Sequence, residues 1–393
     1  MLLVFPVFNI YGSSLLLLSI QGLIFSFLLL KRYHKQRNAS DLLLGLILLI
    51  TCYHQTTYTI GFMEWYDTYR TTKVNYYLID FSLALAPLLF FYIKSTIKPD
   101  FRLSEIRLWH FIPAIIYFLI KVFILISDLQ STGFNEVQNG PMVINFEWKY
   151  VNPFLFLFRT IQMLLYLAFS FQIFFDFREK IKHYFANTYK LELNWLQNFL
   201  AAYSFLYLFY SIQTVVNELI VDLSWIQEWL FYLSSGIAII YVGIKGYFTK
   251  VTELSSIDFA SFAVPANKEH TLIKRISEDK LSARQADISS YFAEHKPFLD
   301  PELTLISLSE KLDMSREELS DVINQGFESR FNDFINSYRI QETKRLIAEG
   351  KHKNLSLLGL AFEAGFNSKA TFNRAFKKSE NQSPSEYLNQ LSK

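Results

Sequence analysis

The chain has 393 residues, of which 51% are hydrophobic and 17% are aromatic. Its single cysteine, Cys52, excludes a disulfide framework and a cysteine-rich zinc site. The net charge of +2 carries little information, because the charge is unevenly distributed. Residues 1–250 contain 34 charged side chains (19 basic, 15 acidic), whereas the 143 residues from 251 onward contain 40 (19 basic, 21 acidic).

Seven apolar stretches in the first part have the length of about 20 residues that a membrane-spanning helix needs. Residues 1–14 contain no positive charge, so we expect the first stretch to be a retained span and not a cleavable signal peptide. These features predict a seven-helix transmembrane sensor domain over residues 1–250. The predicted spans are 9–30, 41–61, 76–97, 107–127, 151–175, 194–220 and 226–248.

The connections between these spans differ in charge. The first, third and fifth connections contain twelve Lys or Arg residues, whereas the connections on the other side contain three. Positively charged loops remain in the cytoplasm. We therefore predict that the N-terminus is outside and that residues 249–393 are inside the cell. A soluble helical core, the alternative, does not explain this asymmetry.

Five ionisable side chains lie within the predicted spans, where such groups are costly and commonly functional. A rise of about 1.5 Å per residue places them roughly 5–12 Å below the outer surface. We predict an outward-facing ligand cavity, in which Lys121 and Arg159 attract an anion and Asp80 pairs with one of them. The alternative is snorkelling together with structural salt bridges between spans. The five residues are His54, Asp80, Lys121, Arg159 and Glu218.

Residues 251–283 are mixed and polar, with Pro265 as a helix breaker, and are predicted to be a linker. The stretch 283–295 has the spacing of an amphipathic helix, with Ile288 and Phe292 on one face. We expect this helix to pack on the domain that follows, residues 284–393, or to pair two chains.

The C-terminal domain contains an internal repeat. Leu308 and Leu312 in the first copy correspond to Leu360 and Ala364 in the second, at an offset of 52 residues. Each copy has the apolar spacing of a helix, a tight turn, a second helix and a closing helix. This order is typical of a helix-turn-helix, which lays its second helix in the major groove of DNA.

Residues that favour helix ends support these boundaries. The long helix between the two copies would separate the two second helices by about one turn of DNA. The predicted caps are Ser315 with Glu318, Asn367, and Ser383 with Pro384 and Glu386, while Gly350 is expected to end the long helix that begins near Arg330.

The second copy, LAFEAGFNSKATFNRAFKKSENQSPSEYL, resembles the C-terminal signature of the AraC/XylS family of bacterial transcription regulators, and the resemblance extends over about residues 295–390. It implies an all-α, bipartite helix-turn-helix domain that controls transcription initiation, here in a protein of the bacterial cytoplasmic membrane. Two positions depart from the pattern, because Asp313 and Asn381 stand where turn glycines are expected. Both residue types tolerate a left-handed backbone better than most.

Ten side chains are predicted to contact DNA. In the first copy, Glu317, Glu318 and Asp321 are unfavourable near phosphates, but other polar residues suit the recognition of bases. In the second copy, basic residues are concentrated on the second helix. Arg316, Asn324 and Gln325 from the first copy, and Asn367, Ser368, Lys369 and Asn373 from the second, are expected near base edges, with Arg374, Lys377 and Lys378 on phosphates.

No motif for a nucleotide, a metal or a catalytic nucleophile is present, so we predict no cofactor, no metal and no enzymatic activity. The sequence predicts a membrane-bound, one-component transcription regulator that binds double-stranded DNA under the control of a small-molecule or protein signal. Membrane lipid, RNA polymerase and a second copy of the chain are expected partners. The alternatives are a transporter- or channel-like protein with a regulatory DNA-binding appendage, a membrane enzyme, and a regulator whose sensing lies in a partner protein.

Overall fold

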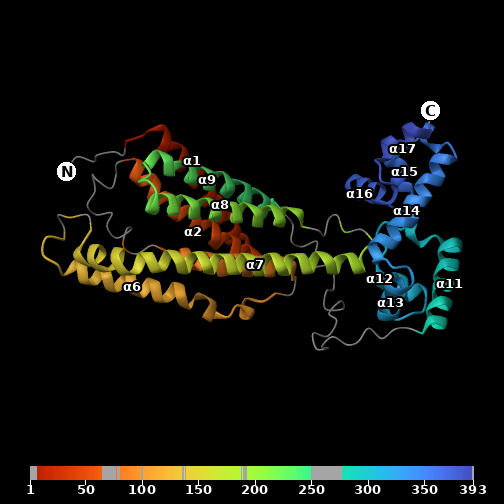
Figure 1. Cartoon of the computed structure of the whole chain (residues 1–393), viewed down its shortest axis with the longest axis horizontal. Coiled ribbons are helices and arrows are strands. Elements are labelled where there is room, and N and C mark those ends of the chain that lie inside the picture. Colours follow the sequence, from red (N-terminus) through yellow and green to blue (C-terminus); the bar gives the residue numbers. More distant parts are fainter. Residues whose placement is uncertain are drawn as a thin grey trace. The chain divides into compact units, whose positions relative to one another are not determined.

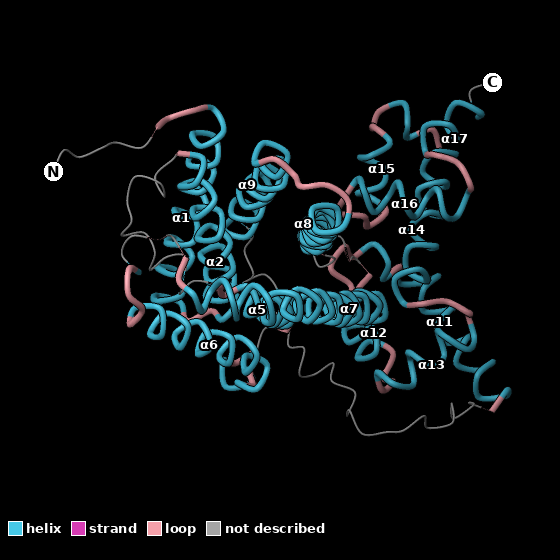
Figure 2. Tube along the Cα trace, turned by 60° about the vertical axis from the view of Figure 1, so that its left-hand side comes forward, coloured by secondary structure: helices cyan, strands magenta, loops and turns pink. Residues whose placement is uncertain are grey.

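The computed structural model divides the chain into two compact units. The N-terminal unit comprises Met1–Phe174 with Asn194–Phe262, and the C-terminal unit comprises Phe175–Leu193 with Ala263–Lys393. The described residues consist of helices and loops without a strand (Figure 2). Most of the predicted linker and the side chain of Glu218 lie outside the described residues. The structure describes residues 7–63, 77, 80–98, 101–134, 137, 139–186, 188, 193–248 and 277–391.

The described helices of the N-terminal unit follow the predicted apolar stretches (Figure 1). Six helical segments are long and apolar enough to cross a membrane. The helix in the third stretch, α5, has 16 residues, so the predicted count of seven spans is not established by helix length. The helices are α1 (Ile10–Gln36), α2 (Ala39–Phe62), α5 (Ser82–Ile97), α6 (Ile112–Leu129), α7 (Asn152–Tyr184), α8 (Asn194–Leu219) and α9 (Trp225–Phe248).

Small and polar residues allow helices α1, α2 and α9 to lie close together. A Cβ atom on Gly22 of α1 would lie 2.4 Å from Cys52 of α2 and 2.4 Å from Ile239 of α9. Ser26 of α1 donates a hydrogen bond to the carbonyl oxygen of Gly45 at 2.7 Å. Close backbone approach and hydrogen bonds of this kind hold membrane helices together, because lipid provides little hydrophobic drive between them.

Large apolar side chains are exposed on α1, α6, α7 and α8 of this unit. Leu17, Phe123, Phe154, Leu164 and Leu208 all expose more than half of their surface. Soluble proteins rarely expose apolar surface of this extent. These helices are therefore suited to an apolar solvent such as the interior of a bilayer.

The C-terminal unit contains two successive helix-turn-helix units joined by a long helix, as the repeat predicts. The joining helix, α14, has 18 residues and a length of roughly 27 Å. It ends before Gly350, which adopts a left-handed conformation with φ 77°. The helices are α11 (Glu278–His295), α12 (Leu305–Lys311), α13 (Arg316–Gly326), α14 (Phe331–Ala348), α15 (Leu357–Glu363), α16 (Lys369–Glu380) and α17 (Pro384–Leu391).

The predicted helix ends are confirmed at most positions. Ser315 accepts a hydrogen bond from the backbone of Glu318 at 3.1 Å, and Ser383 with Glu386 forms a reciprocal capping box. The prediction for Asn367 is wrong, because the side chain of Ser368 caps α16 by accepting from the backbone of Thr371. A hydroxyl at this position bonds the second or third exposed amide of the helix with good geometry.

The two positions that lack the expected turn glycine adopt the backbone that glycine would supply. Asp313 has φ 51° and Asn381 has φ 56°, both in the left-handed region. Short polar side chains reach this region at lower cost than other non-glycine residues. The helix-turn-helix geometry is therefore retained without these glycines.

Candidate nucleic-acid interface and membrane cavity

Helix α16 presents a basic and polar face beside a buried apolar one. Phe372 and Phe376 are buried against Phe366 and Ile340, and Thr371 is also buried. The opposite face is exposed and carries five of the residues predicted to contact DNA. They are Lys369, Asn373, Arg374, Lys377 and Lys378.

Lys378 and Asn367 have partners inside the C-terminal unit. The ammonium of Lys378 lies 2.8 Å from Asp333 at the start of α14, while its side chain remains 66% exposed. Asn367 donates a hydrogen bond to Glu302 at 3.2 Å. Contact of either side chain with DNA would therefore compete with an existing interaction.

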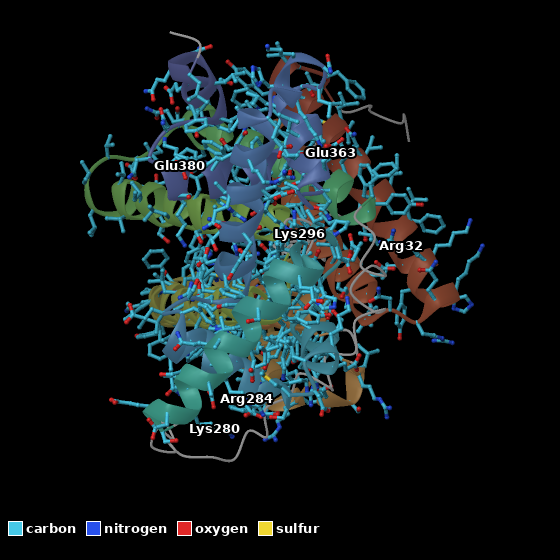
Figure 3. All side chains as sticks on the ribbon, turned by 90° about the vertical axis from the view of Figure 1, so that its right-hand side faces the viewer. Arg32, Lys280, Arg284, Lys296, Glu363 and Glu380 are labelled. Atoms are coloured by element: carbon cyan, nitrogen blue, oxygen red, sulfur yellow. The ribbon has the colours of Figure 1, made fainter. Side chains whose placement is uncertain are left out.

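The corresponding helix of the first unit, α13, is more acidic. Its Asn324 is exposed and donates to Ser320 at 3.3 Å, while Arg316 and Gln325 are half-buried. Lys280 and Arg284 of α11, labelled in Figure 3, pair with Glu318 at 3.0 and 3.2 Å. The hydrogen bond from Lys280 contributes most to a lowered pKa of Glu318, with further contributions from Arg284. Helix α11 thus neutralises one of the three acids that sequence analysis considered unfavourable near phosphates.

The two helix-turn-helix units meet at a rigid junction. Arg339 of α14 is fully buried and donates from Nε to the carbonyl of Phe298 at 2.8 Å and from Nη2 to that of Asp300 at 2.7 Å. Gly365, the turn residue of the second unit, lies directly against Phe298 and Leu299 of the first. The relative placement of α13 and α16 therefore depends on these contacts.

Residues 308–390 match the model of a family described as a helix-turn-helix domain. This region is an AraC-type helix-turn-helix domain. It indicates binding to double-stranded DNA and a role in transcription regulation. Comparison with curated proteins and with solved structures gave no match.

Substitution of Gly365 by alanine is expected to destabilise the AraC-type domain by about 1–3 kcal/mol, because its φ of 93° is strained for any residue with a Cβ atom. That atom would also lie 2.3 Å from the carbonyl oxygen of Phe298. The matched control is Gly359→Ala in α15, where the nearest atom would be 3.4 Å away and alanine favours the helix. Urea unfolding should show opposite signs for the two changes, and equal losses would contradict the assigned turn.

Substitution of Lys378 by alanine is expected to weaken binding to all duplex sequences and to reduce the slope of log affinity against log salt by about one. Asp333→Asn is the matched variant, because it breaks the same ion pair but retains the cation. Its affinity should not fall. If both variants lose affinity equally in a gel-shift titration, Lys378 acts through the fold and not through phosphate.

A segment that follows α7 packs within the C-terminal unit. Ala186 is fully buried in the core of the first helix-turn-helix unit, and its N–H donates to Leu303 at 3.2 Å. The amide of Asn332, on α14, donates to the carbonyls of Ala186 at 2.6 Å and Phe185 at 3.2 Å. Sequence analysis placed this segment in a basic connection and gave it no partner.

Three of the five predicted ligand-binding residues come together in the N-terminal unit. Arg159 of α7 donates to Asp80 at 2.7 Å, and Nε2 of His54 lies 3.9 Å from the same carboxylate. All three line a cavity of about 330 Å³ among α2, α5, α7, α8 and α9. The expected pairing of Asp80 with a basic residue is therefore present.

Lys121 lies apart from this cavity. It is buried, and its ammonium lies 2.6 Å from Glu147, which sequence analysis placed in an external loop. The chain is helical from Val143 onward and leads into α7, and Glu147 reaches Lys121 on the buried face of α6. This pair follows the alternative of a structural salt bridge between spans. The two cations do not combine into the expected anion site.

Sequence analysis missed several uncharged polar residues of the cavity. Gln55 of α2 is 1% exposed, and both polar atoms of its amide lack a hydrogen-bond partner in the described structure. Nε of Arg159, Nε2 of His54 and Oγ of Ser82 also lack one there. Buried polar atoms are usually satisfied, so this concentration of unsatisfied groups makes the cavity a candidate binding site.

Proposed function

We propose that this protein is a membrane-bound transcription regulator whose AraC-type domain binds DNA in response to a signal received by the N-terminal unit. The observation that supports this proposal is the presence of both parts in one chain. The AraC-type domain occupies residues 308–390, and six apolar helical segments precede it. The charge of the loops supports a cytoplasmic location of the C-terminal unit and an external N-terminus.

Helix α7 offers a route between signal and DNA. It continues from Asn152 to Tyr184, with Arg159 lining the cavity and its last turns belonging to the C-terminal unit. Near its end, Glu179 pairs with Arg330 at 2.8 Å. A signal that shifts α7 would therefore act on the first helix-turn-helix unit. It can do so only through different affinities for the two states.

Substitution of Asn332 by alanine tests this route. The side chain holds the segment after α7 by two hydrogen bonds, so its loss should weaken regulation while DNA remains bound. The control is Asn324→Ala, which removes an exposed amide of α13 that donates to Ser320. This residue is predicted to contact DNA, so the control shows what a direct loss of DNA binding does to regulation. Unchanged regulation in Asn332→Ala would contradict coupling through this segment.

The decisive experiment is genome-wide mapping of the DNA bound by the intact protein in its membrane, with and without candidate stimuli. We expect a limited set of sites whose occupancy changes with the stimulus. A reporter enzyme that works only in the cytoplasm should be active when it is fused after residue 393. A periplasmic C-terminus, or no affinity for duplex DNA at low ionic strength, would overturn the proposal.

A further inference from the structure

The cavity of the N-terminal unit contains polar groups that the described protein atoms do not satisfy. The N–H at Nε of Arg159 requires an acceptor, and Oε1 of Gln55 requires a donor. Such groups are costly inside a membrane unless they are hydrogen-bonded. An occupant that both donates and accepts hydrogen bonds would satisfy them.

The charges that line the cavity limit the charge of its occupant. Asp80 and Arg159 form a close ion pair, with side chains that are 23% and 17% exposed. Their charges cancel, and His54, the third ionisable group of the lining, is charged only when protonated. Beside a neutral His54, a charged ligand would be buried without compensation or would have to separate the pair. The cavity is therefore matched to a molecule without charge.

Part of the cavity wall is aromatic. Tyr210, Phe231 and Tyr232 line the cavity, and the ring of Tyr232 stacks on Tyr58 at a centroid distance of 3.7 Å. Aromatic walls favour flat, apolar surfaces. The volume of about 330 Å³ lies at the lower end of the range of roughly 300–1,000 Å³ for small-molecule pockets. This size suits a small metabolite and is too small to enclose a peptide or a whole lipid.

We propose that this cavity binds a small uncharged molecule with a flat ring and a polar head that carries both a hydrogen-bond donor and an acceptor, as a primary amide does. The head contacts Gln55 and Arg159, and the ring lies against the tyrosine and phenylalanine side chains of α8 and α9. The inference identifies the class of signal for the proposed function, and it rests on that function for its effect on DNA.

Three probes with the same ring test this proposal on the full chain in lipid nanodiscs. They are 4-hydroxyphenylacetamide, which is uncharged, 4-hydroxyphenylacetate, an anion, and tyramine, a cation. All six tryptophans lie in the N-terminal unit, so tryptophan fluorescence follows the unfolding of that unit. At saturation the amide should raise Tm by roughly 3 °C, and the charged probes should not.

Two variants connect the shift to the cavity. Gln55→Leu should abolish the shift produced by the amide. Ser19→Ala should retain it, because Ser19 is also buried and unpartnered in the described structure but does not line the cavity. The proposal fails if a charged probe gives the larger shift, if Gln55→Leu responds normally, or if no probe binds and water alone occupies the site.

A second measurement covers the case in which Gln55→Leu does not fold. Ser235→Cys, which places a thiol in the cavity wall, is prepared with Cys52→Ala and treated with N-ethylmaleimide. The amide should slow modification at least threefold, and the acid should not. No protection, or equal protection by the acid, overturns the proposal. Protection without any change in DNA occupancy would instead contradict the proposed function.

Discussion

Replacing Arg339 with methionine is expected to lower the free energy of unfolding of the C-terminal unit by about 2–4 kcal/mol, because one buried and one partly buried carbonyl group lose their donor. These carbonyls belong to Phe298 and Asp300. Methionine keeps an unbranched apolar chain, so much of the packing is retained. Burial lowers the pKa of Arg339 to about 10, so the guanidinium remains charged at neutral pH and donates both hydrogen bonds.

Hydrogen exchange in α14 of the full chain measures this effect, with an expected acceleration of about 30- to 1,000-fold at that range of free energy. The affinity of the protein for a DNA site that contains both half-sites should also fall, because Arg339 holds the loop that contacts Gly365. Arg345→Met on the same helix is the control, since this arginine is exposed and its partner Glu342 keeps a second cation, Lys296, at 3.7 Å. If exchange is equal in both variants, Arg339 does not secure the junction.

The sequence predicts the fold of the C-terminal unit well, because its signals are local. Apolar spacing places the helices, and residues such as Ser315 and Ser383 fix helix starts through bonds to the next few amides. Contacts that join distant segments gave no such signal. Ala186 carries nothing in its own neighbourhood that predicts burial beside Leu303.

The cavity shows the same limit in the N-terminal unit. Hydropathy and charge predict the spans and single out Asp80 and Arg159, but they do not show which way a helix faces. Gln55 lies among threonines in α2, of which Thr51 and Thr56 donate to carbonyls of their own helix. A threonine is satisfied locally in this way, whereas an amide needs an external partner. The ionisable members of the cluster were visible in the sequence, but Gln55 was not.

Replacing Arg159 with methionine is expected to lower the free energy of unfolding of the N-terminal unit by about 3–5 kcal/mol, because Asp80, a mostly buried charge, would lose its close ionic partner. The Nε2 atom of His54, at 3.9 Å from Asp80, is beyond hydrogen-bond distance and does not replace it. The double variant Asp80→Asn with Arg159→Met removes both charges and should recover most of the loss. The difference between single and double variants gives the coupling of the pair. Tryptophan-detected unfolding in nanodiscs measures each variant.

This comparison separates the structural role of the pair from a role in sensing. A folded double variant retains Gln55 and an uncharged cavity, so it should still distinguish the amide probe from the acid, with weaker affinity for the amide because Nε of Arg159 is lost. Lys121→Met is a second control, because it leaves Glu147, which does not line the cavity, without its ionic partner Lys121. This variant should lower the stability of the unit without changing its selectivity for the amide. If the double variant is as unstable as Arg159→Met, the two charges do not stabilise each other, and the argument that their cancellation selects an uncharged ligand fails with it.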